Sequence, residues 1–65
     1  MNWNQIEGNW EQFKGNVQKQ WGKLTNDDLD VIQGQRKELA GRIQKAYGRS
    51  AEDADREIDD WLARH

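Results

Sequence analysis

Few side chains in this 65-residue chain could carry out catalysis. There is one histidine, His65, one serine, Ser50, and no cysteine. His65 is the last residue, where chains are commonly poorly ordered, and Ser50 precedes a predicted helix that its hydroxyl is expected to cap. A nucleophile needs a neighbouring base and a group that orients the base. No such set is present, so we expect that the chain is not an enzyme.

Eight acidic residues are candidates for a divalent cation site. They are Asp53, Asp55, Glu57, Asp59 and Asp60, together with Asp27, Asp28 and Asp30. They lack the spacing of a calcium-binding loop with its distal glutamate, and several start predicted helices, where carboxylates favour the positive helix end. Without cysteine, a thiolate metal site is excluded. We expect no specific metal site.

Five basic residues are concentrated in the segment 34–49, and they are Arg36, Lys37, Arg42, Lys45 and Arg49. Such a patch could follow a phosphate backbone, with Tyr47 or a tryptophan stacking on bases. However, the net charge is −2, and the segment 50–65 has six acidic and two basic residues. We favour charge complementarity within the molecule and keep a nucleic-acid or protein binding module using 34–49 as the alternative.

Helices must position these groups. There is no proline, good helix formers are abundant, and apolar residues recur every three or four positions. The longest stripe consists of Trp3, Ile6, Trp10, Phe13, Val17 and Trp21; shorter ones are Leu29 with Ile32, Leu39 with Ile43, Ala46 and Tyr47, and Ala54 with Ile58, Trp61 and Leu62. The spacing predicts helices over 3–21, 26–33, 35–47 and 51–63.

An internal repeat with an offset of 26 residues organises the chain. The segment GNWEQFKGNVQKQWGK at 8–23 aligns with GQRKELAGRIQKAYGR at 34–49. Thr25 with Asp28, and Ser50 with Asp53, have the spacing of capping boxes, while Gly22 and Gly48 are predicted to end helices in a left-handed conformation. Each unit, about 8–33 and 34–62, is therefore predicted to be helix, turn, helix.

These observations predict a single all-α domain over 1–65. We expect a small bundle of four helices that form two packed helical hairpins related by an internal pseudo-two-fold repeat. The chain has only eleven Leu, Ile, Val and Phe residues, so its four tryptophans are expected to supply much of a thin core. Gly15 and Gly41 fall inside helices on the side away from the apolar stripe. We expect each to mark a close contact with a neighbouring helix or turn, and the alternative is the close approach of a partner helix or a phosphate.

No apolar run approaches the ~20 residues that a membrane span requires, and no secretion signal is recognisable. The absence of cysteine fits a reducing compartment. We expect a soluble, cytoplasmic protein without membrane contact.

The strings NWEQFKGNVQKQWGKLTNDDL at 9–29 and IQGQRKELAGRIQKAYG at 32–48 resemble the CsbD-like family of small bacterial stress proteins, in particular its YjbJ-type branch. The resemblance extends from Gly8 to Trp61. It implies a compact bundle of two helical hairpins, expression associated with general stress, no enzyme activity and no cofactor. The family offers no catalytic or binding motif to carry over.

Three hypotheses for function follow. The first is a stress-associated protein that acts through bulk physical properties or weak protein contacts; its mean hydropathy of −1.27 resembles that of hydrophilic protectants, although its tryptophans do not. The second is the nucleic-acid or protein binding module at 34–49. The third is a homo-oligomer built on surplus aromatic surface.

Overall fold

The computed structural model describes residues 1–64 and contains five α-helices, with no strand in this range. The all-α class is as predicted, but the helix count is five rather than four. His65, considered above as the only histidine, lies outside the described residues. The helices are α1 (Trp3–Gly8), α2 (Trp10–Gln20), α3 (Asn26–Ile32), α4 (Arg36–Tyr47) and α5 (Ala51–Arg64).

The predicted helix over 3–21 is wrong because it breaks at Asn9. Asn9 ends α1 and begins α2 with a non-helical backbone, φ −128° and ψ 43°. Its N–H donates to the carbonyls of Gln5 and Ile6, and its own carbonyl accepts from the next helix. Gly8 and Asn9 are both weak helix formers, so interrupting the helix at this pair costs little free energy.

The helix starts follow the predicted capping pattern. Thr25 and Asp28 form both halves of a capping box at the start of α3. At the start of α5 the Ser50 hydroxyl accepts a hydrogen bond from the Asp53 N–H, with a donor–acceptor distance of 3.1 Å. Each hydroxyl thus satisfies a first-turn amide that has no partner inside its helix.

The helix ends agree with prediction at one of two glycines. Gly48 closes α4 with φ 67°, as expected. Gly22 does not have a positive φ; α2 ends at Trp21, with φ −118°. The left-handed conformation instead occurs at Gln33, which closes α3 with φ 46°, and at the following Gly34, with φ 81°.

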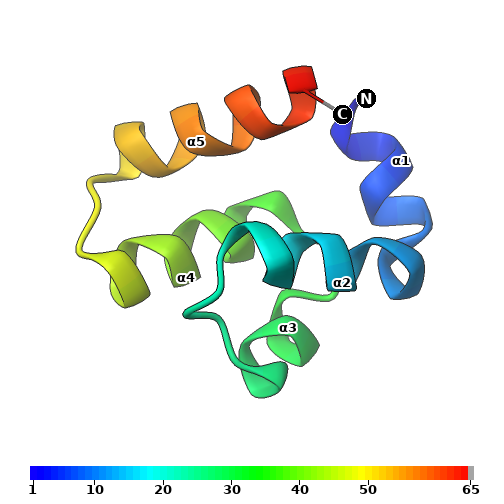
Figure 1. Ribbon diagram of the computed structural model, residues 1–65, viewed down its shortest axis with the longest axis horizontal. Helices are drawn as coiled ribbons and strands as arrows, with labels where there is room; N and C mark the ends of the chain where they lie inside the picture. Colours follow the sequence, from blue (N-terminus) through cyan, green and yellow to red (C-terminus); the bar gives the residue numbers. More distant parts are fainter. Residues whose placement is uncertain (65) are drawn as a thin grey trace.

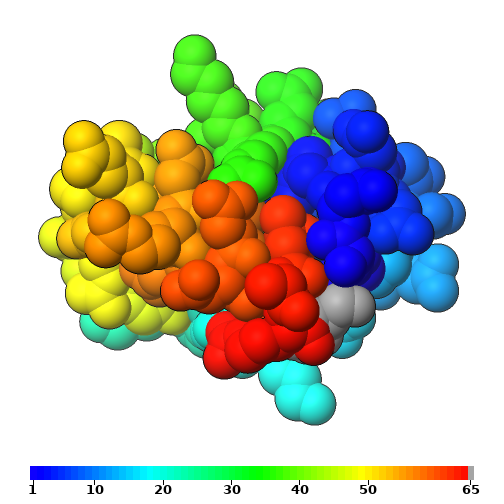
Figure 2. All heavy atoms as spheres, turned by 90° about the horizontal axis from the view of Figure 1, so that it is seen from above, coloured from blue at the N-terminus to red at the C-terminus, as the bar shows by residue number. Residues whose placement is uncertain are grey.

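Helix α4 lies between α5 and α3 and packs against both (Figure 1). The pair of α4 and α5 is the second predicted hairpin. In the first repeat unit α3 packs chiefly on α4, across the repeat boundary, rather than on α2. The pseudo-two-fold relation between the two units stays a prediction. Figure 2 shows the N-terminal segment beside the end of α5, where the Met1 ammonium contacts the Leu62 carbonyl at 3.3 Å.

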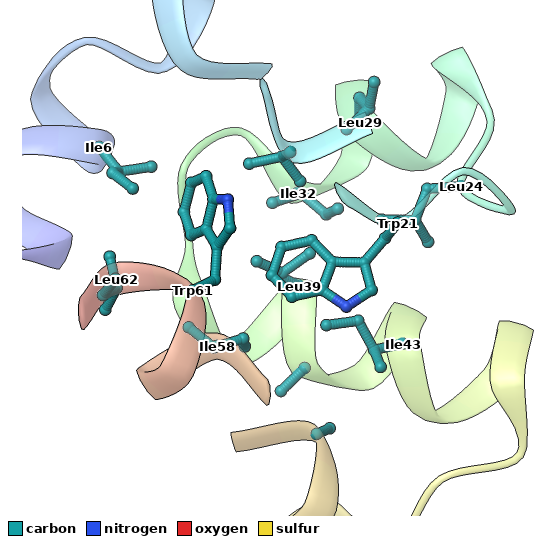
Figure 3. Packing of buried hydrophobic residues seen from close by; sticks show 13 residues of the cluster. Ile6, Trp21, Leu24, Leu29, Ile32, Leu39, Ile43, Ile58, Trp61 and Leu62 are labelled. Atoms are coloured by element: carbon teal, nitrogen blue, oxygen red, sulfur yellow. The ribbon is translucent and has the colours of Figure 1, made fainter. Parts of the chain in front are cut away.

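The core is built around two indole rings. Trp21 and Trp61 are 1% exposed, and their ring centroids lie 5.6 Å apart in an edge-to-face arrangement. Leu39, Ile43 and Ile58 surround them (Figure 3). Edge-to-face pairs contribute about 0.5–1.5 kcal/mol beyond the apolar area that they bury. Within residues 1–64 every buried side chain is apolar.

The other two tryptophans, Trp3 and Trp10, are half-buried; Trp3 binds the segment that joins α3 to α4, and Trp10 binds α3 itself. The Trp3 indole N–H donates to the Gly34 carbonyl at 2.8 Å, and the Trp10 indole N–H donates to the Leu29 carbonyl at 3.3 Å. Because a partly buried indole N–H needs an acceptor, both rings are oriented by backbone carbonyls.

The prediction of a close contact at Gly15 and Gly41 is wrong. A Cβ added at either position would meet nothing within 4 Å, and both residues are exposed. The close contact is at Gly34, where a Cβ would lie 3.2 Å from the Glu7 Cα and 3.3 Å from the Trp10 Cβ. The turn between α3 and α4 therefore packs directly against the break between α1 and α2.

Replacing Gly34 with Ala should destabilise the fold, whereas Gly15→Ala should stabilise it. At Gly34 the new methyl group meets backbone and the residue has a positive φ, so the free energy of unfolding should fall by more than about 1 kcal/mol. At Gly15 the gain in helix propensity should raise it by about 0.5–1 kcal/mol. Urea unfolding followed by circular dichroism measures both; equal effects of the two substitutions would contradict this assignment of the contact.

Candidate functional surface

The five basic residues predicted as a binding patch lie on α4 and just after it, but they do not form one free surface. Three of them, Arg36, Arg42 and Arg49, form ion pairs with other elements. The two lysines, Lys37 and Lys45, are exposed and have no hydrogen bond or ion pair within residues 1–64. The patch is therefore divided into structural arginines and free lysines.

Two arginines tie α4 and the residues after it to α5. Arg36 Nη2 lies 2.7 Å from Asp59 Oδ1 and donates to the Asp55 carbonyl at 3.2 Å. Arg49 Nε lies 2.9 Å from Glu57 Oε2. The acidic helix α5 thus neutralises one arginine at the start of α4 and another just after its end. These side chains are between about a third and two thirds exposed, so each pair adds little on its own to stability.

The third arginine connects α4 to the start of α3. Arg42 Nη1 lies 3.1 Å from Asp28 Oδ1, while Asp28 Oδ2 accepts the Thr25 backbone N–H at 2.9 Å. The Thr25 backbone N–H chiefly lowers the pKa of Asp28, with smaller contributions from the Thr25 hydroxyl and Arg42. Both carboxylate oxygens of Asp28 are therefore occupied, and Arg42 is positioned by a helix cap.

Tyr47, considered above as a base-stacking residue, is engaged inside the molecule. Its hydroxyl accepts the Lys23 backbone N–H at 3.0 Å. The Lys23 ammonium lies 5.1 Å from the ring centroid and the Arg49 guanidinium 5.7 Å. The cations over its ring are in cation–π range.

The acidic residues are distributed along helix surfaces instead of converging. Within residues 1–64 no group of three or more His, Cys, Asp or Glu side chains is placed to hold a metal ion. Asp53 Oδ1 lies 3.9 Å from Arg56 Nη1 in a long ion pair. Asp55 and Asp59 face Arg36. In the same range, no helix is long and apolar enough to cross a bilayer.

Sequence reasoning missed the role of Gln33 and Gly34. The repeat alignment pairs Gly34 with Gly8, and the predicted helix over 26–33 includes Gln33. The signal available was the pair itself, because a glycine directly after the last apolar residues of a helix commonly marks its end. The same segment forms one wall of a hollow at the break between α1 and α2.

Replacing Asp28 with Asn should lower the free energy of unfolding at neutral pH and have little effect in acid. The folded-state pKa of Asp28 lies below its ordinary value of 3.8, so the charged carboxylate stabilises the fold above that pH. This stabilisation is lost as the pH falls through the folded-state pKa. Urea midpoints of both proteins, measured in steps from pH 7 down to pH 2, follow the loss of this difference in stability.

The matched control is Asp27→Asn, which removes an exposed charge from the same first turn of α3. It tests the contribution of the helix dipole without the bonds to Thr25 and Arg42. If both variants lost the same stability at pH 7, the network around Asp28 would have no effect of its own.

Comparisons with known proteins identify the family of this chain. The model of a family described as CsbD-like matches residues 4–56. UPF0337 protein YjbJ of an Escherichia coli strain is 51% identical over 65 residues, which cover 100% of this chain and 94% of that protein. A UPF0337 protein of Rhodopseudomonas palustris is 56% identical over 62 residues, covering 95% of this chain and 94% of its own. With a family match over most of its length and full-length relatives at about half identity, the chain belongs to the CsbD-like family.

Proposed function

We propose that this chain is a non-catalytic, stress-associated protein of the cytoplasm that acts through its hydrophilic folded surface or through weak protein contacts. The observation that carries the proposal is the separation of residue types. The buried side chains of residues 1–64 are all apolar, and charged groups of both signs cover the outside. The association with stress rests on the family resemblance.

The distribution of charge supports weak rather than tight contacts. Arg36, Arg42 and Arg49 are paired with carboxylates of the same chain, and this pairing lowers the local field around α4. In the described part of the chain only Val31, at 50%, is a large apolar residue with high exposure. A surface of this kind is well hydrated and offers a partner little apolar area to bury.

The residues that could carry catalysis support the non-catalytic part of the proposal. Ser50, the only serine, uses its hydroxyl as a helix cap. Asp28, whose pKa is lowered, is engaged by Thr25 and Arg42. A lowered carboxyl pKa with structural partners is typical of an ion-pair network rather than of a general acid or base.

A freeze-labile enzyme should keep more of its activity through repeated freezing with this protein than with an equal mass of an inert globular protein. The hydrophilic surface is expected to separate partly unfolded molecules before they aggregate. Residual activity after several freeze–thaw cycles is the measurement. No advantage over the inert control would end the proposal.

A matched variant separates the two ways in which protection could work. Replacing both Lys37 and Lys45 with Gln removes the free cations of α4 without breaking an ion pair. Protection that survives this change indicates the bulk surface, and protection that falls indicates contacts made through α4.

The second candidate is the binding module on the basic helix, and the free lysines favour it. Lys37 and Lys45 lie eight residues apart on α4, and the exposed Gly41 lies between them. Two phosphate contacts of this kind would give only weak, salt-dependent binding.

Nucleic-acid binding through α4 should disappear in the Lys37→Glu, Lys45→Glu variant while its circular dichroism spectrum stays unchanged. Arg42→Glu is a poor choice, because it would break the pair with Asp28. Filter binding of single- and double-stranded DNA at about 50 mM salt is the measurement. If the unmodified protein is not retained under these conditions, the nucleic-acid form of the second candidate is excluded.

A further inference from the structure

A hollow of about 530 Å³ lies where the chain breaks between α1 and α2. This volume is within the range of small-molecule sites, about 300–1,000 Å³. Its polar and aromatic lining residues are Glu7, Asn9, Trp10, Glu11, Gln12 and Gln33. Five of them are close in sequence, and Gln33 is brought to them by the turn after α3.

Trp10 is the aromatic residue among those that line the hollow. The ring is half-buried, and its N–H already donates to the Leu29 carbonyl at 3.3 Å. Its Cβ is fixed against the backbone of Gly34, where an added Cβ would come within 3.3 Å. The indole N–H and the Cβ of Trp10 are therefore both engaged inside the molecule, so a ligand in the hollow would contact this residue through its apolar carbons.

Three carboxamides line the same hollow. The side-chain oxygens of Asn9, Gln12 and Gln33 accept no hydrogen bond within residues 1–64, and only Asn9 uses its amide group, in a long 3.4 Å bond to the Gln5 carbonyl. Asn9 stands at the N-cap of α2 without capping it. Gln33 occupies a left-handed conformation that usually favours glycine or asparagine.

The charges around the hollow select among ligands. Glu7 and Glu11 line it and no cation does, so an anion is disfavoured. Glu11 is already paired with Lys14 at 2.9 Å, which leaves Glu7 as a free acceptor. Each carboxamide offers both donors and an acceptor, which suits a neutral ligand that carries many hydroxyl groups.

We propose that this hollow binds a neutral polyhydroxylated molecule, a mono- or disaccharide. The C–H face of the sugar ring stacks on Trp10, and its hydroxyls exchange hydrogen bonds with Asn9, Gln12, Gln33 and Glu7. The site is open and polar, so the affinity falls in the millimolar range. This binding does not depend on the protective role proposed above, and the two can fail separately.

The test uses the full chain labelled with ¹⁵N, titrated with glucose and with trehalose, and the indole N–H signal of Trp10 is followed by NMR. A saturable shift is expected at Trp10 and at the side-chain amides of Asn9, Gln12 and Gln33. The indole signals of Trp21 and Trp61, buried away from the hollow, report any general effect of the sugar on the solvent in the same sample. Linear shifts of similar size at all tryptophans would overturn the proposal.

Two substitutions on α2 provide a matched pair. Gln12→Ala removes one hydrogen-bonding group from the hollow, and we expect a Kd about threefold to tenfold higher, the loss typical of one neutral hydrogen bond. Gln20→Ala makes the same change on the same helix outside the hollow and should leave the Kd unchanged. Equal Kd values for the two variants would contradict the assigned site.

A parallel titration with spermidine and with tetramethylammonium tests the competing ligand class. Organic cations can also stack on an indole and contact a carboxylate. Saturable binding of these cations together with no saturable binding of either sugar would overturn the choice of a neutral ligand.

Discussion

The contact between Trp21 and Trp61 joins the N-terminal and C-terminal parts of the chain in one core. Trp21 closes α2, whereas Trp61 lies in the last turns of α5. A chain with eleven Leu, Ile, Val and Phe residues has little other apolar area to bury, and the two indoles fill the space between α4 and the elements around it. The fixed positions of the charged side chains on the surface depend on this core.

Helical periodicity predicted most of the buried faces. The stripes that contain Val17, Leu39, Ile43 and Ile58 are buried as expected, since period and burial are linked by helix geometry. The same periodicity concealed the break at Asn9, because the spacing from Trp3 through Trp10 stays in phase across it. Local patterns of this kind report which side faces the core and do not report the direction in which the chain continues.

Glycines and charges were harder to interpret from sequence, because their roles depend on distant partners. Gly34 is confined by Glu7, twenty-seven positions away, whereas Gly15 and Gly41 face open space. Similarly, counting charges located the basic segment but could not separate Arg42, which meets Asp28 on another helix, from Lys45, which meets nothing in the described part of the chain. The hollow beside Trp10 was not predicted for the same reason, since Gln33 reaches it only through a tertiary contact.

The hydrogen bonds from Trp3 and Trp10 have a consequence for how the sequence can vary. Both indoles bind carbonyl oxygens of the main chain, at Gly34 and Leu29, so part of the attachment of α3 uses atoms that every amino acid carries. Substitutions on the outer side of α3 leave these bonds in place. Related chains are therefore free to diverge on the outer side of this helix and still retain these two bonds, provided that the two indole donors and the glycine between α3 and α4 persist.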